Sequence, residues 1–282
     1  MSQPHPNLFL IGAQKGGSST LAHQMARHPA IAFFSKKEPN FFREADPDAC
    51  RAAIAAAGPP PEAPWLLDAS VDYARQPLHP TPPANIRAVC GPEARIAYLM
   101  RNPFERAVSE YFWKRERFGE HRSMEEVFLA PGSQYVATGF YDLQIEAYLR
   151  HFDRAQLHLM TFEQYFADQD AGFAALCAWL GIDPMPVAGL GIARGGTDKK
   201  MTRTARFAPI NRAVQASPAL RRAIKAVLPH RTLKKATQAL SRPVPREKVP
   251  DGLRERMLGE IFAPSVARTE ALTGLDLSAW KV

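Results

Sequence analysis

The stretch Asn7–Leu21, NLFLIGAQKGGSSTL, predicts a buried strand that passes through a glycine turn into a helix. Leu8–Ile11 is a continuous apolar run, which is typical of a parallel strand covered on both faces. Gly12, Gly16 and Gly17 then allow positive φ angles and a close approach of the backbone to a ligand. Because free amides and the positive end of a helix dipole attract anions, this stretch predicts a site for a phosphate-like group.

The lysine of this turn does not stand where the loop of nucleoside triphosphatases has it. Gly12 and Gly17 keep the G-x-x-x-x-G spacing of that loop, but the next residue is serine where the motif has lysine. The lysine is Lys15, before the last two glycines. A strand, a turn and a lysine can coincide by chance, yet together they favour phosphate binding over ATP hydrolysis. Three residues after the turn can each cap the helix that follows: Ser18, Ser19 and Thr20.

Length and composition indicate one large α/β domain. A chain of 282 residues, 46% of them hydrophobic, can bury a substantial core. The cysteines, Cys50, Cys90 and Cys177, form no C-x-x-C pair, so we expect neither a disulfide framework nor a metal site. No apolar run approaches the roughly 18 residues of a membrane span, and the first residues lack a signal-peptide pattern. We therefore expect a cytoplasmic location.

A second polar motif follows the apolar strand predicted over Ala94–Met100. Arg101 stands at the carboxyl end of this strand, Pro103 opens a helix expected to reach about Phe118, and Ser109 lies within that helix. Arginine suits bidentate phosphate binding, and serine adds a neutral donor. Since an ATPase would place an aspartate for Mg²⁺ near such a strand end, Arg101 indicates a phosphate that is handled without metal.

A carboxylate follows another apolar strand, predicted over Ile31–Phe34. Glu38 lies in the run Ser35–Phe42, SKKEPNFF, between this strand and an aromatic pair. Ligands of open parallel α/β sheets bind at the carboxyl ends of the strands, which makes Glu38 a candidate general base. A surface ion pair with Lys36 or Lys37 explains the same pattern, and the residues alone leave both interpretations open.

The two phosphate motifs resemble those of sulfotransferases that use 3′-phosphoadenylyl sulfate (PAPS), in the branch of the heparan sulfate sulfotransferases and their bacterial relatives. Residues 15–21 match the family's first loop, K-x-G-[ST]-[ST]-x-L, and residues 101–111 match R-[DN]-P-x-x-R-x-x-S-x-Y. Residues 37–42, KEPNFF, resemble the K-E-x-H-F-F run whose glutamate is the catalytic base in glycosaminoglycan sulfotransferases. Asn40 departs from that run, and Ala69 stands where a further family run has lysine.

The resemblance, with the alternation of strands and helices, predicts a P-loop-like three-layer α/β/α fold with a central parallel sheet and a single domain over residues 1–282. It implies that PAPS donates a sulfuryl group to a hydroxyl of a glycan, glycolipid or small molecule. Glu38 would be the general base, with Asp68 or Asp72 as the next candidates, and Lys15 would stabilise the leaving phosphate. The other implied donor contacts are Gly16, Gly17, Ser18, Ser19, Thr20, Arg101, Ser109 and, in a late basic loop, Arg194, with Lys199 and Lys200 as alternatives.

The net charge of +8 conceals an asymmetry along the chain. Residues 194–256 hold 17 Lys and Arg against 4 Asp and Glu, a balance of +13 that leaves −5 for the remainder. Ala219–Leu228 sets its apolar residues along one helical stripe, so we expect a mostly helical segment that serves as a lid or an acceptor-side insertion. A solvated basic face packed on the core explains the pattern too. The sharper hypothesis is contact with an anionic or lipid-linked acceptor, or with the inner membrane surface.

Two other functional classes stay open. A P-loop kinase-like phosphotransferase would share the first strand and turn, although the displaced Lys15 and the position of Arg101 argue against it. A nucleic-acid-binding protein would explain the basic segment. No aromatic platform or known motif accompanies those charges, so we expect no nucleic-acid partner.

Overall fold

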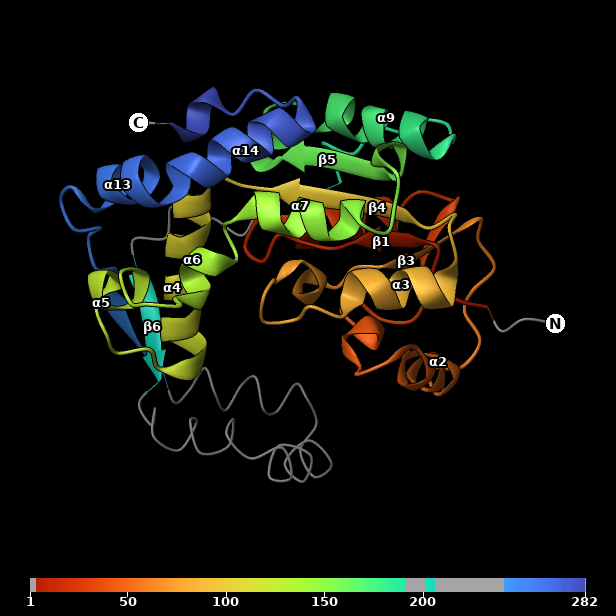
Figure 1. The fold of residues 1–282 in the computed structure, drawn as a ribbon, viewed down its shortest axis with the longest axis horizontal. Coiled ribbons are helices and arrows are strands. Elements are labelled where there is room, and N and C mark those ends of the chain that lie inside the picture. The colour runs from red at the N-terminus through yellow and green to blue at the C-terminus, as the bar shows by residue number, and fades with distance from the viewer. Residues whose placement is uncertain (1–3, 191–200, 206–240, 282) are drawn as a thin grey trace.

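The computed structural model describes residues 4–190, 201–205 and 241–281 of the chain. These residues contain a five-stranded parallel sheet in the order β2-β3-β1-β4-β5, with helices on both faces (Figure 1). The predicted three-layer α/β/α fold with a central parallel sheet is therefore confirmed. The strands are β1 (Leu8–Leu10), β2 (Ile31–Phe33), β3 (Trp65–Asp68), β4 (Arg95–Met100) and β5 (Leu157–Thr161).

Strand β1 lies at the centre of the sheet and contributes to two separate hydrophobic cores. Leu8 and Leu10 belong to one core, and Phe9 and Ile11 belong to the other. Successive side chains of a strand point to opposite faces, so a continuous apolar run here serves both layers of helices. One layer contains α1 (Ser18–Met25), α8 (Phe162–Ala167) and α9 (Gln169–Leu180). The other contains α2 (Pro47–Ala55), α3 (Pro82–Cys90), α4 (Pro103–Phe118), α5 (Met124–Phe128), α6 (Gln134–Ala137) and α7 (Tyr141–Leu149).

The four prolines of Gln76–Ala84 predict a loop, yet helix α3 begins inside this stretch. Pro82 and Pro83 occupy the first turn of the helix. Proline is tolerated there because the amides of the first turn have no intrahelical acceptor, so these prolines start a helix rather than interrupt one. Short 3-10 turns complete this side: η1 (Phe41–Arg43), η2 (Val71–Ala74) and η3 (Arg154–Gln156).

The last helices pack against α7 and α4. They are α13 (Leu253–Arg256), the π-helical η4 (Met257–Phe262), α14 (Ala263–Thr273) and η5 (Ser278–Trp280). The buried Trp280 donates from Nε1 to Glu163 at 3.0 Å, and the other carboxylate oxygen of Glu163 accepts from the Asn102 amide at 2.9 Å. The closing segment therefore supports the residue that caps α4.

The basic segment 194–256 is described only in part. Strands β6 (Met201–Ala205) and β7 (Ser241–Pro245) pair antiparallel, and β6 packs against α4 (Figure 1). Glu247, just after β7, accepts a hydrogen bond from Tyr111 of α4 at 2.9 Å. The helical stripe expected over Ala219–Leu228 lies outside the described residues. The mostly helical lid or insertion therefore stays a prediction. The described part of the basic segment includes the two strands β6 and β7.

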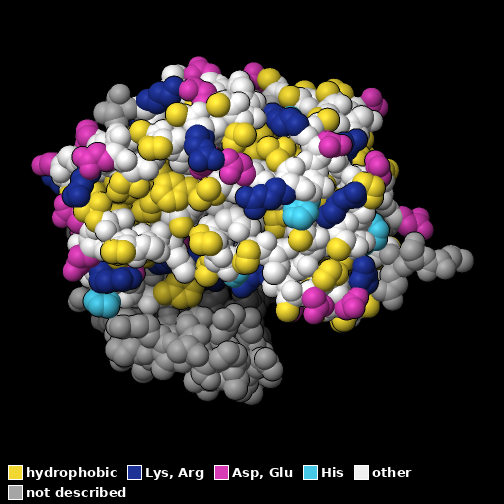
Figure 2. Space-filling view, in the orientation of Figure 1, with side chains coloured by type: hydrophobic (Ala, Val, Ile, Leu, Met, Phe, Trp, Pro, Cys, Tyr) yellow, Lys and Arg dark blue, Asp and Glu magenta, His cyan; other side chains and the backbone are white. Residues whose placement is uncertain are grey.

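The described surface mixes charges of both signs. On the face shown in Figure 2, Lys and Arg side chains alternate with Asp and Glu and with apolar patches. This face therefore presents no extended field of a single sign. Among the helices described, none has the length and apolar character needed to cross a membrane.

Candidate active site

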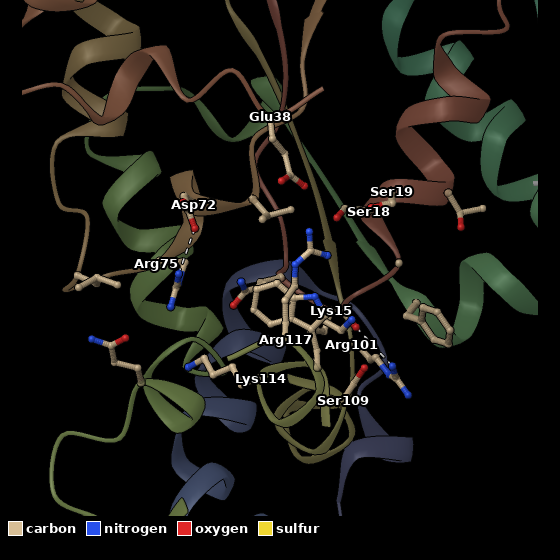
Figure 3. Close-up of a pocket in the computed structure, with 18 of the residues that line it drawn as sticks. Lys15, Ser18, Ser19, Glu38, Asp72, Arg75, Arg101, Ser109, Lys114 and Arg117 are labelled. Atoms are coloured by element: carbon tan, nitrogen blue, oxygen red, sulfur yellow. Dashed lines mark hydrogen bonds and ion pairs between the residues drawn. The ribbon is translucent and has the colours of Figure 1, made fainter. Parts of the chain in front are cut away.

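A cavity of about 840 Å³ opens at the carboxyl ends of the central strands, within the range of about 300–1,000 Å³ that is usual for ligand pockets. Four strands send residues into its wall. Lys15 follows β1, Glu38 follows β2, Asp72 follows β3, and Arg101 follows β4. The sheet thus collects residues that are far apart in the sequence, and α4 supplies another part of the wall, including Ser109 (Figure 3).

The glycine turn packs too tightly for side chains. A Cβ atom at Gly16 would lie 2.9 Å from the carbonyl oxygen of Leu99 on β4. Gly17 has a φ of +90°, and a Cβ atom there would lie 2.7 Å from the ring of Phe166 on α8. Both glycines are required because the backbone itself approaches β4 and α8. Gly17 lines the cavity. Gly16 does not line it, and instead allows the turn to pack against β4.

The start of α1 faces the cavity with Ser18, Ser19 and Thr20. Its N-cap residue is Gly17, which has no side chain to occupy the amides of the first turn. Those amides lack acceptors within the helix, and the helix dipole adds positive potential at this end. The arrangement suits a bound anion, as the sequence predicts.

Arg101 brings the second motif against the glycine turn. Its side chain is 8% exposed, and Nη1 donates to the carbonyl oxygen of Lys15 at 3.4 Å. The guanidinium lies 4.8 Å from the ring centroid of Phe162, and Glu105 is 4.0 Å away. Tyr141 fixes the backbone here by donating to the Arg101 carbonyl oxygen at 2.5 Å. Burial lowers the pKa of Arg101 from its ordinary value, although neighbouring carboxylates oppose that effect. Two motifs separated by 86 residues therefore meet in one wall.

Helix α4 lays a row of side chains along the cavity. Ser109, Trp113 and Arg117 are spaced four residues apart, which places them on one face of the helix. The Nζ atom of Lys15 lies 5.8 Å from the ring centroid of Trp113. Sequence reasoning identified Ser109 and missed the other two, although their spacing from Ser109 was a usable signal.

Glu38 lines the cavity and also forms the ion pair with Lys37, so the pair is observed and the role of general base stays a prediction. Its side chain is 42% exposed. Glu38 and Asn40 have φ angles of +59° and +60°, and Lys15 has +66°. These are the non-glycine residues with positive φ in the described part of the chain, and all three line the cavity. Such conformations cost about 1–3 kcal/mol each and cluster at functional sites.

Comparison with known proteins identifies the family. Residues 5–189 match the sequence profile of the sulfotransferase domain. The chain belongs to the sulfotransferase family. The match covers the sheet, the glycine turn and α4, and it makes the protein a transferase. No curated protein sequence matches the chain.

Solved structures of other sulfotransferases are similar to this one. A sulfotransferase from Alicyclobacillus acidocaldarius has a TM-score of 0.65 and 25% identity, over 98% of this chain and 99% of that chain. Mouse sulfotransferase SULT7A1, solved in complex with PAP, has a TM-score of 0.48 and 18% identity, over 65% of this chain and 61% of its own. The bacterial structure thus matches nearly end to end.

Asp68 of this sulfotransferase anchors the loop after β2. Its two carboxylate oxygens accept from Ser70 Oγ at 2.6 Å and from Tyr73 Oη at 2.7 Å. Ser70 Oγ in turn accepts from the Asn40 amide at 3.1 Å, and Tyr73 Oη accepts from the Phe42 amide at 3.2 Å. Burial raises the pKa of Asp68 to about 7, against the lowering effect of its two hydrogen bonds. Asp68 does not line the cavity, so its position suits support of the loop rather than contact with a substrate.

The structure gathers most of the predicted site residues. Arg194 lies outside the described residues, and Gly16 belongs to the turn without lining the cavity. Asp72, an alternative base, lines the cavity between Arg43 and Arg75. Within residues 4–190, 201–205 and 241–281, no group of three or more His, Cys, Asp or Glu side chains could hold a metal ion. The predicted residues that share the cavity are Lys15, Gly17, Ser18, Ser19, Thr20, Glu38, Arg101 and Ser109.

Proposed function

We propose that this sulfotransferase uses PAPS as its donor and transfers the sulfuryl group to an acceptor hydroxyl. The bond between sulfur and the bridging phosphate oxygen breaks as the acceptor oxygen bonds to sulfur. The products are adenosine 3′,5′-bisphosphate (PAP) and a sulfate ester, and the acceptor proton passes to a base. The observation that carries the proposal is the meeting of Arg101 with the backbone of Lys15 in one cavity, since the two motifs would hold one nucleotide.

On this proposal the glycine turn and α1 hold the 5′-phosphosulfate. Gly16 and Gly17 admit only backbone at the turn, which fits close approach of a phosphate. Lys15 and the first amides of α1 would stabilise the charge that grows on the leaving phosphate oxygen. A well-placed donor of this kind contributes about 3–4 kcal/mol to the transition state. Arg101 and Ser109 would bind the 3′-phosphate, and Arg194 is proposed for the same group from the family resemblance alone.

Glu38 is the proposed general base. It lies at the cavity wall on the β2 side of the sheet, where an acceptor hydroxyl can reach it from solvent. Removing the proton from an alcohol as it attacks contributes roughly 10²- to 10⁴-fold to a rate. Asp68, with its buried hydrogen bonds, is a less suitable base than Glu38 because neither of its oxygens faces the cavity.

Family membership favours sulfuryl transfer over the kinase-like and nucleic-acid-binding alternatives. The finer expectations stay predictions: the heparan sulfate branch, the single domain over residues 1–282, the cytoplasmic location, the absence of a metal and contact with a membrane surface.

Two measurements on the purified protein test the proposal. Isothermal titration calorimetry should detect binding of PAP, and radiolabelled PAPS should yield PAP and a labelled ester when hydroxyl-bearing acceptors are supplied. Arg51→Gln is a suitable control variant because Arg51 pairs with Asp48 on the exposed face of α2, away from the cavity. Failure to bind PAP, or Mg²⁺-dependent turnover of ATP, would contradict the proposal.

A further inference from the structure

Two carboxylates near the cavity are each shared by two cations. Asp72 accepts from Arg43 at 2.6 Å and from Arg75 at 3.1 Å. One carboxylate neutralises one guanidinium, so this group of three side chains retains one positive charge. Two residues of this group, Asp72 and Arg75, line the cavity. The side chain of Arg75 is 12% exposed. The Nε atom of Arg75 is buried and makes no hydrogen bond within the described part of the protein.

Glu110 of α4 forms a second group of the same kind. It is fully buried and pairs with Arg106 at 2.7 Å and with Lys114 at 2.8 Å. Burial raises the pKa of Glu110, but the charges of Arg106 and Lys114 outweigh that effect and hold the pKa below its ordinary value. Lys114 lines the cavity, with Nζ 3.9 Å from the ring centroid of Tyr135. One excess positive charge is thus fixed on this wall as well.

These two groups lie away from the proposed donor contacts. Arg75 follows β3, whereas Arg101 follows β4, and two strand spacings separate these strands by about 10 Å. On α4, Lys114 is five residues beyond Ser109, which is about 7.5 Å along the helix. Figure 3 shows Arg75 and Lys114 on one side of the cavity and Arg101 and Ser109 on the other.

Glu38 lies at the top of the same view, above both sides, with its carboxylate pointing down into the cavity. A molecule that presents its hydroxyl to Glu38 from the side opposite the glycine turn would extend toward Arg75 and Lys114. Partly buried guanidinium and ammonium groups whose charge is not fully neutralised bind carboxylate, sulfate or phosphate groups through charge-assisted hydrogen bonds. Leu78, which is 42% exposed at the cavity, offers apolar contact to the rest of such a molecule.

We propose that Arg75 and Lys114 form an anion subsite for the acceptor, so that the preferred acceptor carries a carboxylate, sulfate or phosphate group in addition to its reacting hydroxyl. This inference rests on the proposed function and deepens it. The hydroxyl oxygen receives the sulfuryl group, Glu38 takes its proton, and the anionic group stays unreacted on Arg75 and Lys114.

Matched acceptor pairs that differ only in charge test the subsite. Two such pairs are 4-hydroxyphenylacetate with 4-hydroxyphenylacetamide, and methyl glucuronide with its uronamide. One charge-assisted hydrogen bond is worth about tenfold or more in affinity, so kcat/KM with PAPS should favour the carboxylate by at least about tenfold. Where a pair is not turned over, calorimetric binding of each member to the enzyme–PAP complex gives the same comparison.

Variants of the two cations assign the preference to the subsite. Arg75→Gln and Lys114→Met should each reduce the preference for the carboxylate to under about threefold, whereas Arg75→Lys and Lys114→Arg should retain most of it because the charge remains. Arg51→Gln, which removes an exposed arginine paired with an aspartate outside the cavity, should leave the preference unchanged.

Any of the following results would overturn the subsite. The wild-type enzyme could treat both members of every pair alike, or bind none of them. The variants could retain the full preference. Arg75→Gln or Lys114→Met could weaken PAP binding about tenfold, which would assign these cations to the donor. Failure of wild-type PAP binding, measured before any acceptor is added, would instead signal failure of the proposed function.

Discussion

The two sides of the cavity are built differently. On the β1–β4 side, the glycine turn excludes side chains, Ser18 is buried, and the side chain of Arg101 is 8% exposed. On the β2–β3 side, Glu38 is exposed over 42% of its side chain, and Leu78 over 42%. The β1–β4 side therefore consists of closely packed backbone and the buried guanidinium of Arg101. The other side is made of side chains on loops, supported from beneath by Asp68.

This difference indicates which side can vary. The β1–β4 side depends on close backbone packing, so a substitution there disturbs the sheet as well as the ligand. The β2–β3 side can exchange side chains while the sheet is retained. A site that binds a constant donor and a family-specific acceptor would have this division, and the following predictions test it, beginning with the largest effect.

Glu38→Gln should lower kcat by about 10²- to 10⁴-fold because the amide cannot take the acceptor proton. The dissociation constant of PAP should stay within about twofold of wild type if the two sides act separately. Steady-state kinetics and calorimetry give both values. Near-normal turnover would remove Glu38 as the base and make Asp72 the next residue to test.

Lys15→Ala should lower kcat by about 10²- to 10³-fold, the usual result of removing one donor from a developing oxyanion. The acceptor KM should change little, because Lys15 belongs to the other side of the cavity. Comparing kcat and KM over an acceptor titration checks this. A change confined to the acceptor KM would contradict the division.

Arg101→Gln should weaken PAP binding by roughly 10- to 100-fold, as expected when a charge-assisted hydrogen bond to phosphate is lost. Adenosine 5′-phosphosulfate, which lacks the 3′-phosphate, should bind the variant and the wild type about equally. Calorimetric titration with both nucleotides separates the two cases. An unchanged dissociation constant for PAP would show that Arg101 does not contact the nucleotide.

Asp68→Asn should alter the pH dependence of stability. The pKa of the Asp68 carboxyl group is about 7 in the folded protein and has its ordinary value of 3.8 in the unfolded chain. Between these values the folded state holds the extra proton, so the free energy of unfolding falls as the pH rises. From pH 6 to pH 8 the wild type should lose about 1.4 kcal/mol more than the variant.

Urea denaturation at both pH values measures this difference, and other titrating groups cancel between the two proteins. Equal slopes for wild type and variant would mean that Asp68 titrates as an ordinary exposed aspartate. Loss of turnover in Asp68→Asn, together with normal turnover in Glu38→Gln, would transfer the role of base to Asp68.

Local sequence patterns predicted the β1–β4 side well. The apolar run Leu8–Ile11 serves two cores, and Pro103 starts α4, which ends at Phe118 as expected. These features depend on short-range chemistry: strand periodicity, glycine in a turn and proline at the first position of a helix.

The β2–β3 side was predicted less completely because its contacts are not local. Arg75 follows β3 and Lys114 lies on α4, and no spacing in the sequence relates the two residues. The burial of Asp68 and its bonds to the loop after β2 depend on the tertiary fold. Pro82 and Pro83 start a helix where their pattern predicts a loop, because proline at a helix start and proline in a turn look the same in the local sequence.

The position of Trp113 provides an optical probe that needs no label. Of the four tryptophans in the chain, it lines the cavity, whereas Trp65, Trp179 and Trp280 belong to β3, α9 and η5. The ammonium group of Lys15 is 5.8 Å from its ring, so a nucleotide that draws this group onto a phosphate will change the indole emission. Stopped-flow fluorescence can then time donor arrival and product departure, with Trp113→Phe as the silent reference.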